Sequence, residues 1–274
     1  MTTNNKCVAV LTRGYPTLDQ YQDLIERNES INKNLKDKTI PILIFHEGNI
    51  EETHQTHISS KTPELNIQYI DIKKDQKAFR LEKESIPFDP ETAAFSIGYR
   101  HMCSFWIMDF WHFVSEYDFL LRIDEDCVID FEIDPVFQQL QEENIQLITS
   151  HWGNDSTLVT KGMNYFSIYF LSNIYRLSET QIYQIPQRMQ ASGPCCVFGL
   201  NLKILRTNRL LLPFLTELEK TNRIYSHRWG DGPLWGEIIG YLLDDNNSLT
   251  PCYKLDTNIR YFHKSLQQSI TPEK

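Results

Sequence analysis

The chain has 274 residues, of which 41% are hydrophobic and 23% are charged, so a packed core can form and a disordered chain is excluded. The formal net charge of -9 excludes nucleic acid as a general partner, because a polyphosphate binds to a basic surface. A nucleotide is not excluded, since one cation can neutralise its two phosphates.

The apolar run near the N-terminus, Val8 to Leu11, is too short for a signal sequence or a membrane span. Elsewhere, no stretch approaches the roughly 18 apolar residues that a span requires. We therefore expect a soluble chain with no membrane span.

The cysteines are scattered, and none has the CxxC or CxxH spacing that is typical of zinc sites. We expect reduced thiols in or near the core, which fits a cytosolic compartment. A disulfide that involves Cys252 is the alternative. The six cysteines are Cys7, Cys103, Cys127, Cys195, Cys196 and Cys252.

The first seventy residues alternate between buried-type strands and a helix. A β-branched run that ends in Thr12-Arg13-Gly14 predicts a strand followed by a loop. Residues 17–35 have apolar side chains at helical spacing, with Thr17 as a candidate cap. Two more strands are predicted at 39–48 and 66–73. This order predicts an α/β domain with a largely parallel sheet.

The rest of the chain continues the α/β pattern after a charged segment, 73–91, that is predicted to be mostly loop. Residues 92–116 predict a long aromatic-rich helix, and 163–175 fit either a helix or a strand. The other expected elements are, in chain order, strands at 118–123 and 145–152, a strand and then a helix within 195–222, a helix at 232–245 and a strand at 255–265. No repeat or linker interrupts them, so we predict one domain.

Three adjacent acids, Asp124, Glu125 and Asp126, directly follow an apolar strand. In extended backbone, residues i and i+2 point the same way, so Asp124 and Asp126 are expected to converge while Glu125 turns away. Two carboxylates at the carboxyl end of a strand suit a hard divalent cation such as Mn²⁺ or Mg²⁺. In open α/β sheets, ligands bind at this edge. The alternative is a solvated acidic turn.

A second candidate segment is YSHRWGDGPLWGE, residues 225–237. Its glycines and proline predict a tight turn before a helix, with Asp231 inside the turn. Asp231 is either only a helix N-cap or a functional carboxylate. Aromatic rings beside a carboxylate are typical of sugar sites, and basic side chains can contact phosphate or carboxylate. The neighbours that we expect to make such contacts are Trp229, Trp235, His227 and Arg228.

A third candidate is the run Tyr99, Arg100 and His101 in an otherwise apolar helical pattern. Three polar residues together indicate a helix face at a cleft, and an exposed turn of helix is the alternative.

Together, these segments resemble the fungal α-1,2-mannosyltransferases of glycosyltransferase family 15. The similarity covers roughly residues 95–130 and 195–263, with a compatible first strand at Val8 to Arg13. The matching motifs are Tyr99-Arg100-His101-Met102-Cys103, Tyr117-Asp118, Arg122-Ile123-Asp124, Arg228-Trp229-Gly230-Asp231 before Pro233, and His263 in the sequence YFH.

The resemblance implies a GT-A fold, which is a Rossmann-like α/β fold with a mostly parallel central sheet flanked by helices. We expect a single domain, 1–274, with a nucleotide-binding part at about 1–130 and an acceptor-binding part at about 131–274. Mn²⁺ (or Mg²⁺) would be the cofactor. The resemblance implies Asp124 and His263 as metal ligands, Tyr99 near the donor diphosphate and Arg13 near the nucleotide; we add Asp126 as a ligand from its spacing and assign Arg122 to the donor site.

The implied activity is transfer of a sugar from a nucleotide-diphosphate donor to a glycan hydroxyl, with GDP-mannose favoured over a UDP-sugar. Lys203 stands where the family has the glutamate that is discussed as its nucleophile. If the reaction inverts, Asp231 is the candidate base; if it retains, the donor phosphate can serve and Asp231 binds the acceptor.

Other activities stay open. They are transfer of another sugar such as xylose or glucose, a nucleotidyltransferase or phosphohydrolase reaction on a similar sheet, and carbohydrate binding without catalysis. The family is Golgi-anchored, so this chain is either a trimmed catalytic domain or a cytoplasmic enzyme, and we expect the second. The sequence indicates no oligomeric state.

Overall fold

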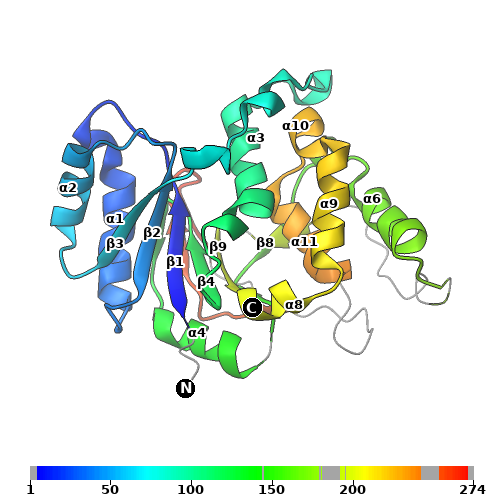
Figure 1. Ribbon diagram of the computed structural model, residues 1–274. Coiled ribbons are helices and arrows are strands. Elements are labelled where there is room, and N and C mark those ends of the chain that lie inside the picture. The colour runs from blue at the N-terminus through cyan, green and yellow to red at the C-terminus, as the bar shows by residue number, and fades with distance from the viewer. Residues whose placement is uncertain are drawn as a thin grey trace.

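The computed structural model describes residues 5–143, 145–178, 180, 192–194, 196–241 and 253–270. Within these residues, seven strands form one sheet in the order β10-β6-β9-β4-β1-β2-β3 (Figure 1). Only β9 runs antiparallel to its neighbours in this sheet, so the predicted, mostly parallel sheet is confirmed. The strands are β1 (Lys6–Leu11), β2 (Pro41–His46), β3 (Asn66–Asp71), β4 (Phe119–Ile123), β6 (Leu147–Thr149), β9 (Val197–Asn201) and β10 (Tyr253–Leu255).

Two smaller sheets complete the described strands. One has the order β12-β11-β5 and the other pairs β7 with β8. In the first, His263 lies directly opposite Cys127, so a late segment of the chain returns to the residues that follow β4. These strands are β5 (Cys127–Ile129), β7 (Trp152–Asn154), β8 (Ser192–Pro194), β11 (Tyr261–His263) and β12 (Gln268–Ile270).

Helices cover both faces of the large sheet, and among the described helices none has the length and apolarity to cross a bilayer. They are α1 (Gln22–Asn34), α2 (Glu52–Lys61), α3 (Ile97–Ser104), α4 (Ile133–Glu142), α5 (Thr157–Thr160), α6 (Met163–Tyr169), α8 (Leu202–Thr207), α9 (Leu211–Thr221), α10 (Arg223–His227) and α11 (Asp231–Tyr241).

The two faces are covered because the strands are apolar on both sides. In β1, Cys7 and Ala9 belong to the core with α3, α9 and α11, whereas Val8 belongs to the core with α1 and α4. Side chains alternate between the faces of a strand, so adjacent residues reach different helices. Figure 1 shows α1 and α2 beside β1 to β3, and α3, α9 and α11 beyond β4.

The structure changes the bounds of several predicted elements. The helix expected at 92–116 begins at Ile97, because the Ser96 hydroxyl accepts a hydrogen bond from the Tyr99 backbone and caps the helix there. It continues as a π-helix, Phe105–Asp109, and a 3-10 turn, Phe110–His112. The strand expected at 145–152 is divided into β6 and β7, and the one expected at 255–265 is only partly extended, at its two ends.

The segment 163–175, for which the pattern fitted two structures, is helical. It forms α6 and then a π-helix, Phe170–Ile174. The helix predicted at 232–245 begins at Asp231, and residues 242–245 lie outside the described residues.

Asp109 ends the first π-helix with its carboxylate inside the core. The residue is 4% exposed, and its Oδ2 has no hydrogen-bond partner. Burial raises the pKa of Asp109 to about 7, although Arg80 favours the charged form. Because the folded chain keeps a proton that the unfolded chain releases near the ordinary pKa of 3.8, stability falls as the pH rises from that value to about 7.

The substitution Asp109→Asn is therefore expected to raise the Tm at pH 8 by roughly 2–4 °C, because a neutral amide removes the cost of a buried charge. At pH 4.5 the gain should be smaller, since native Asp109 is then protonated. Thermal unfolding followed by circular dichroism at both pH values tests this. Asp130→Asn, at an exposed acid, is the control and should change the Tm less at pH 8. An equal effect of Asp109→Asn at both pH values would contradict the assignment.

Candidate functional site

Arg122, near the carboxyl end of β4, lies between two carboxylates. Its Nε and Nη2 donate to Oδ1 and Oδ2 of Asp124 at 2.6 and 3.0 Å, and its Nη1 donates to Oδ2 of Asp231 at the start of α11. The guanidinium also lies 4.4 Å from the ring centroid of Trp106. Burial lowers the pKa of Arg122, but the two carboxylates raise it by more, so the net pKa lies above its usual range. Arg122 therefore joins β4 to α11 as a permanent cation.

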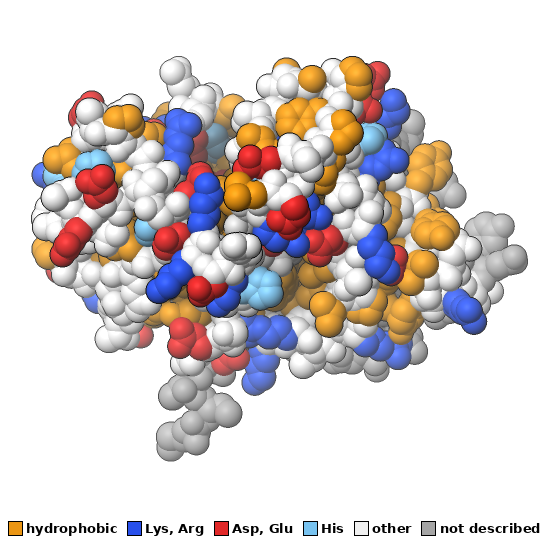
Figure 2. Space-filling view, turned by 45° about the horizontal axis from the view of Figure 1, so that its top comes forward, with side chains coloured by type: hydrophobic (Ala, Val, Ile, Leu, Met, Phe, Trp, Pro, Cys, Tyr) orange, Lys and Arg blue, Asp and Glu red, His pale blue; other side chains and the backbone are white. Residues whose placement is uncertain are grey.

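Two cavities meet at this arginine. One, of about 250 Å³, reaches Tyr99, Cys196 and Asp231, and the other, of about 390 Å³, reaches Arg13 and Asp126. Both are also lined by Met102, Arg122 and Asp124. The residues that were predicted to bind the donor thus line connected cavities. Figure 2 turns the top of the Figure 1 view forward and shows acidic and basic side chains mixed on that face.

The three acidic residues lie on a turn and not in the extended backbone that was assumed for them. The chain turns after β4, with the Cys127 backbone nitrogen donating to the Asp124 carbonyl at 3.1 Å, so i and i+2 do not share one strand face. Glu125 has a structural contact, because Thr12 Oγ1 donates a hydrogen bond to its Oε2 at 2.8 Å. Burial raises the pKa of Glu125. Its carboxylate therefore holds the end of β1 to the turn.

Asp126, which was added to the predicted metal ligands from its spacing, lies beside His263. Its Oδ2 lies 3.7 Å from Nδ1 of His263, and the Ser265 hydroxyl donates to the same oxygen. The Lys264 backbone nitrogen donates to the Asp126 carbonyl at 2.9 Å, which extends the pairing of β5 with β11. The Leu266 backbone nitrogen lies 3.3 Å from the same Nδ1.

Asp124, Asp126 and His263 fit a divalent cation. Asp124 and Asp126 line one cavity, and Asp126 touches His263. Each oxygen of Asp124 accepts one hydrogen bond from Arg122 and keeps a second lone pair. Carboxylate oxygens are the ligands that Mn²⁺ and Mg²⁺ prefer, and a carboxylate-bound imidazole is a common third ligand.

A second arginine, Arg27 of α1, binds backbone carbonyl oxygens of the two strands that precede the acidic turn and the Thr12 loop. It is fully buried and donates to the carbonyl oxygens of Ile123 at 2.8 Å and Ala9 at 3.2 Å. Burial lowers its pKa to about 10, against the attraction of Asp124, so it is charged at neutral pH. Sequence analysis missed this residue. The available signal was its position on the apolar face of the helix, three residues after Leu24 and four before Ile31.

Of the run Tyr99, Arg100 and His101, only Tyr99 lines a cavity. Arg228 donates to the Tyr99 hydroxyl at 2.6 Å and to Asp155 Oδ2 at 2.6 Å. Burial raises the pKa of Tyr99, so its hydroxyl keeps its proton. Arg100 and His101 are buried elsewhere, because successive helical residues point roughly 100° apart. The prediction of a cleft face is therefore correct for one residue of the three.

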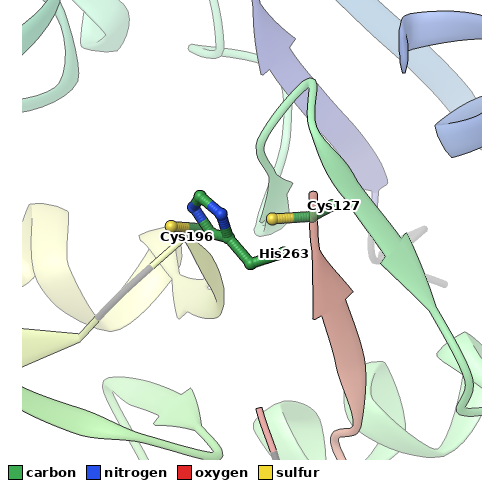
Figure 3. Close-up of side chains that lie close together, drawn as sticks. All are labelled: Cys127, Cys196 and His263. Atoms are coloured by element: carbon green, nitrogen blue, oxygen red, sulfur yellow. The ribbon is translucent and has the colours of Figure 1, made fainter. Parts of the chain in front are cut away.

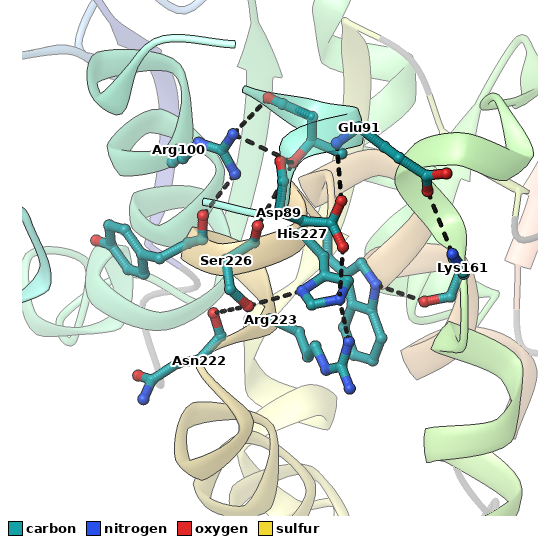
Figure 4. A network of polar contacts seen from close by, with 11 residues as sticks. Asp89, Glu91, Arg100, Lys161, Asn222, Arg223, Ser226 and His227 are labelled. Atoms are coloured by element: carbon teal, nitrogen blue, oxygen red, sulfur yellow. Dashed lines mark hydrogen bonds and ion pairs between the residues drawn. The ribbon is translucent and has the colours of Figure 1, made fainter. Parts of the chain in front are cut away.

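Arg100 and His227 belong to a network that holds the loop before α3 against α10 (Figure 4). The Asp89 backbone nitrogen donates to the Ser226 carbonyl at 2.8 Å, and His227 Nε2 lies 3.4 Å from Asp89 Oδ2. Arg100 donates to the Thr92 carbonyl at 2.6 Å. His227 lines neither cavity, so the predicted phosphate contact is replaced by a role in fixing this loop.

The two tryptophans that were predicted to contact sugar are core residues. Trp229 is 2% exposed and Trp235 is 1% exposed. Their indole nitrogens donate to the carbonyl oxygens of Lys161 at 3.1 Å and Trp106 at 3.2 Å, respectively. Neither ring has a face for a ligand. The predicted sugar contacts are wrong because Trp229 packs against Phe166 of α6 and Trp235 packs against Trp111 of the 3-10 turn.

Two glycines bring Asp231 close to the cavity. A Cβ on Gly193 would lie 1.7 Å from the Gly232 carbonyl oxygen, and one on Gly232 would lie 2.7 Å from the Pro194 carbonyl oxygen. Only glycine permits this approach of β8 to α11.

Lys203 lies far from the acids. Its backbone nitrogen donates to the carbonyl of Asp118, just before β4, whereas Asp124 follows the other end of that strand. The position that was compared with the family's glutamate is thus outside the site. The described cysteines, Cys7, Cys103, Cys127 and Cys196, are free thiols, as predicted, and Cys195 and Cys252 lie outside the described residues.

The fold is similar to that of solved glycosyltransferases. The mannosyltransferase Ktr4p from S. cerevisiae matches 96% of this chain and 70% of its own, with a TM-score of 0.73 and 15% identity. Core-mannan synthase A (CmsA/Ktr4) from Aspergillus fumigatus, in an Mn/GDP form, matches 96% and 75%, with a TM-score of 0.71 and 14% identity. Mouse xyloside xylosyltransferase 1 matches 85% and 81%, with a TM-score of 0.54 and 11% identity.

No family model and no curated protein matches the sequence. At these identities the likeness establishes the fold, so the predicted GT-A fold is confirmed.

Replacing Arg122 with Gln is expected to destabilise the fold by about 3 kcal/mol or more, because the buried carboxylate of Asp231 and the half-buried carboxylate of Asp124 lose their cation. Urea unfolding gives the free energy. Adding Asp124→Asn to that variant should recover part of the loss, as expected for a coupled pair. Lys36→Gln, in an exposed ion pair, is the control and should cost less than about 1 kcal/mol. An Arg122→Gln effect as small as the control would contradict this prediction.

Proposed function

We propose that the chain is a metal-dependent glycosyltransferase of the family 15 type, which moves a sugar from a nucleotide-diphosphate donor to a glycan hydroxyl. The observation that carries the proposal is the convergence of Asp124, Asp126 and His263 at the carboxyl end of β4, beside two connected cavities. In open α/β sheets this edge is where ligands bind.

The similar structures support the choice of donor and cation. One was solved as an Mn/GDP form and another with GDP, and both proteins carry mannan or mannosyltransferase names. We therefore favour GDP-mannose as donor and Mn²⁺ as cofactor, with Mg²⁺ as the other candidate. The similar xylosyltransferase keeps a UDP-sugar such as UDP-xylose as the alternative.

Asp124, Asp126 and His263 would hold the cation, which when bound neutralises charge that develops on the leaving diphosphate. Arg13 lines the larger cavity and lies over the Tyr15 ring at 5.0 Å, where it can bind the nucleotide. The Tyr99 hydroxyl, held by Arg228, can donate to a phosphate oxygen. Arg122 orients Asp124 and lines both cavities, which supports its proposed role at the donor site.

Asp231 lines the smaller cavity together with Tyr99, Arg122 and Asp124. Arg122 holds its Oδ2, and its Oδ1 is the oxygen that would accept a hydrogen bond from an acceptor hydroxyl. In an inverting reaction this carboxylate takes the hydroxyl proton; in a retaining one it positions the acceptor while the donor phosphate takes the proton. The division into donor and acceptor parts and the cytoplasmic location stay predictions.

Binding of GDP and UDP is expected to depend on Mn²⁺, with Kd at least tenfold lower when the cation is present, because the cation bridges the protein to the diphosphate. Asp126→Asn should remove most of this dependence, since it removes a proposed metal ligand and leaves the hydrogen bonds of Arg122 in place. Calorimetry with each nucleotide, with and without Mn²⁺, measures it. Asp130→Asn is the matched acid control. Equal Kd values with and without Mn²⁺ would contradict the proposal of a metal-dependent glycosyltransferase.

Asp231→Asn is expected to lower kcat for transfer by 10²–10⁴-fold if the carboxylate is the base, with the Kd for nucleotide within about twofold of the parent value. NMR of the anomeric product of the parent enzyme decides between inversion and retention. Retention together with a loss below about tenfold would assign Asp231 to acceptor binding. If kcat and the acceptor KM do not change, Asp231 has no role in catalysis or in acceptor binding.

A further inference from the structure

Two thiols and an imidazole meet beside the acidic turn. Cys127 begins β5, Cys196 immediately precedes β9 and His263 ends β11 (Figure 3). One ligand atom from each residue lies within 4.8 Å of the other two. Nothing in the sequence spacing indicates this group, because it joins three distant segments.

Backbone hydrogen bonds place all three residues. His263 and Cys127 are directly opposite each other in the pairing of β11 with β5. The Asp124 backbone nitrogen donates to the Cys196 carbonyl at 3.1 Å, which ties Cys196 to the turn. The cluster is therefore held by the fold and does not depend on flexible surface side chains.

The chemistry of this group favours a soft cation. Thiolate and imidazole ligands select zinc, whereas Mn²⁺ and Mg²⁺ prefer oxygen. Tetrahedral zinc with bonds of about 2.3 Å to sulfur and about 2.0 Å to nitrogen needs ligand atoms about 3.5–3.8 Å apart. The three atoms can reach this spacing with side-chain shifts of about an ångström.

A carboxylate and an open side complete the arrangement. Asp126 Oδ2 lies 3.7 Å from His263 Nδ1, and Asp126 Oδ1 lies 3.9 Å from Cys127 Sγ. A histidine that binds zinc through one nitrogen commonly donates from the other to a carboxylate. Nδ1 of His263 here accepts a hydrogen bond from the Leu266 backbone N–H. If a metal binds Nε2, the proton moves to Nδ1, and Asp126 is the carboxylate that would accept its hydrogen bond in place of the Leu266 contact. Cys127 and His263 are buried, whereas Cys196 lines the smaller cavity.

We propose that Cys127, Cys196 and His263 form a binding site for Zn²⁺, with a fourth position open to the cavity that Cys196 lines. Three protein ligands and an open position are typical of zinc that binds a water or a substrate atom. This site goes beyond the proposed function, because it rests on the two thiols, although it shares His263 with the proposed Mn²⁺ site. If that function holds, zinc and Mn²⁺ would compete for His263.

Co²⁺ is the probe for this site. It is added to the full chain in the presence of a reductant that does not bind metals. Binding is expected to give intense sulfur-to-cobalt charge-transfer bands in the near ultraviolet and tetrahedral bands in the visible region. Zn²⁺ should displace them at equimolar amounts, and a large excess of Mg²⁺ should not. Cys127→Ser and Cys196→Ser should each weaken Zn²⁺ binding at least tenfold, measured by competition with a chromogenic chelator, and the double variant should lose the charge-transfer bands. Cys103→Ser, at a free buried thiol of α3, is the control and should keep them.

Weak octahedral cobalt bands without charge transfer, or full bands in the double variant, would overturn the proposal. If circular dichroism shows that a variant does not fold, alkylation of the parent chain tests the zinc site instead. Zn²⁺ should protect Cys196 from iodoacetamide by at least fivefold in rate, located by mass spectrometry, and equal rates with and without Zn²⁺ would overturn the site. Metal-dependent nucleotide binding is measured separately, so either proposal can fail alone.

Discussion

Arg122 neutralises two carboxylates that approach from different parts of the chain. Asp124 follows the strand that carries Arg122, whereas Asp231 begins a helix more than a hundred residues later. Without the cation between them, the carboxylates of buried Asp231 and half-buried Asp124 would repel each other and would not recover the free energy of their lost hydration. The Trp106 and Phe198 rings enclose the guanidinium and so strengthen its attraction to both acids. The geometry of the site depends on this arginine, since it fixes β4, α11 and the cavities between them.

Arg27 provides hydrogen-bond donors for backbone carbonyl oxygens next to the acidic turn. Strands that end side by side leave carbonyl oxygens without partners, and the guanidinium binds those of Ala9 and Ile123. Glu125 reaches back to Thr12 at the same edge. The turn is therefore held by the Arg27 guanidinium and by the hydrogen bond between Thr12 and Glu125. Such fixation limits the reorganisation that ligand binding would require.

Local patterns in the sequence predicted the strands and helices of the sheet well, because apolar runs and helical spacing reflect burial on each face. Strand ends and turn signals indicated Asp124, Asp126 and Asp231 as candidate site residues, whereas Arg13 and Tyr99 were assigned to the donor site only through the resemblance to family 15. Local patterns failed where tertiary packing decides. Trp229 and Trp235 look like ligand contacts only until the helices that bury them are placed, and the direction of Glu125 depends on a turn that strand geometry does not describe.

The pairing of β11 with β5 has a consequence for the order in which the molecule is built. His263 comes after every strand of the large sheet in the chain, yet it lies opposite Cys127. During synthesis on the ribosome, the sheet edge and its acids would emerge and begin to fold well before their histidine is made. The site is therefore completed by one of the last strands that the ribosome makes, more than a hundred residues after the acids of the turn.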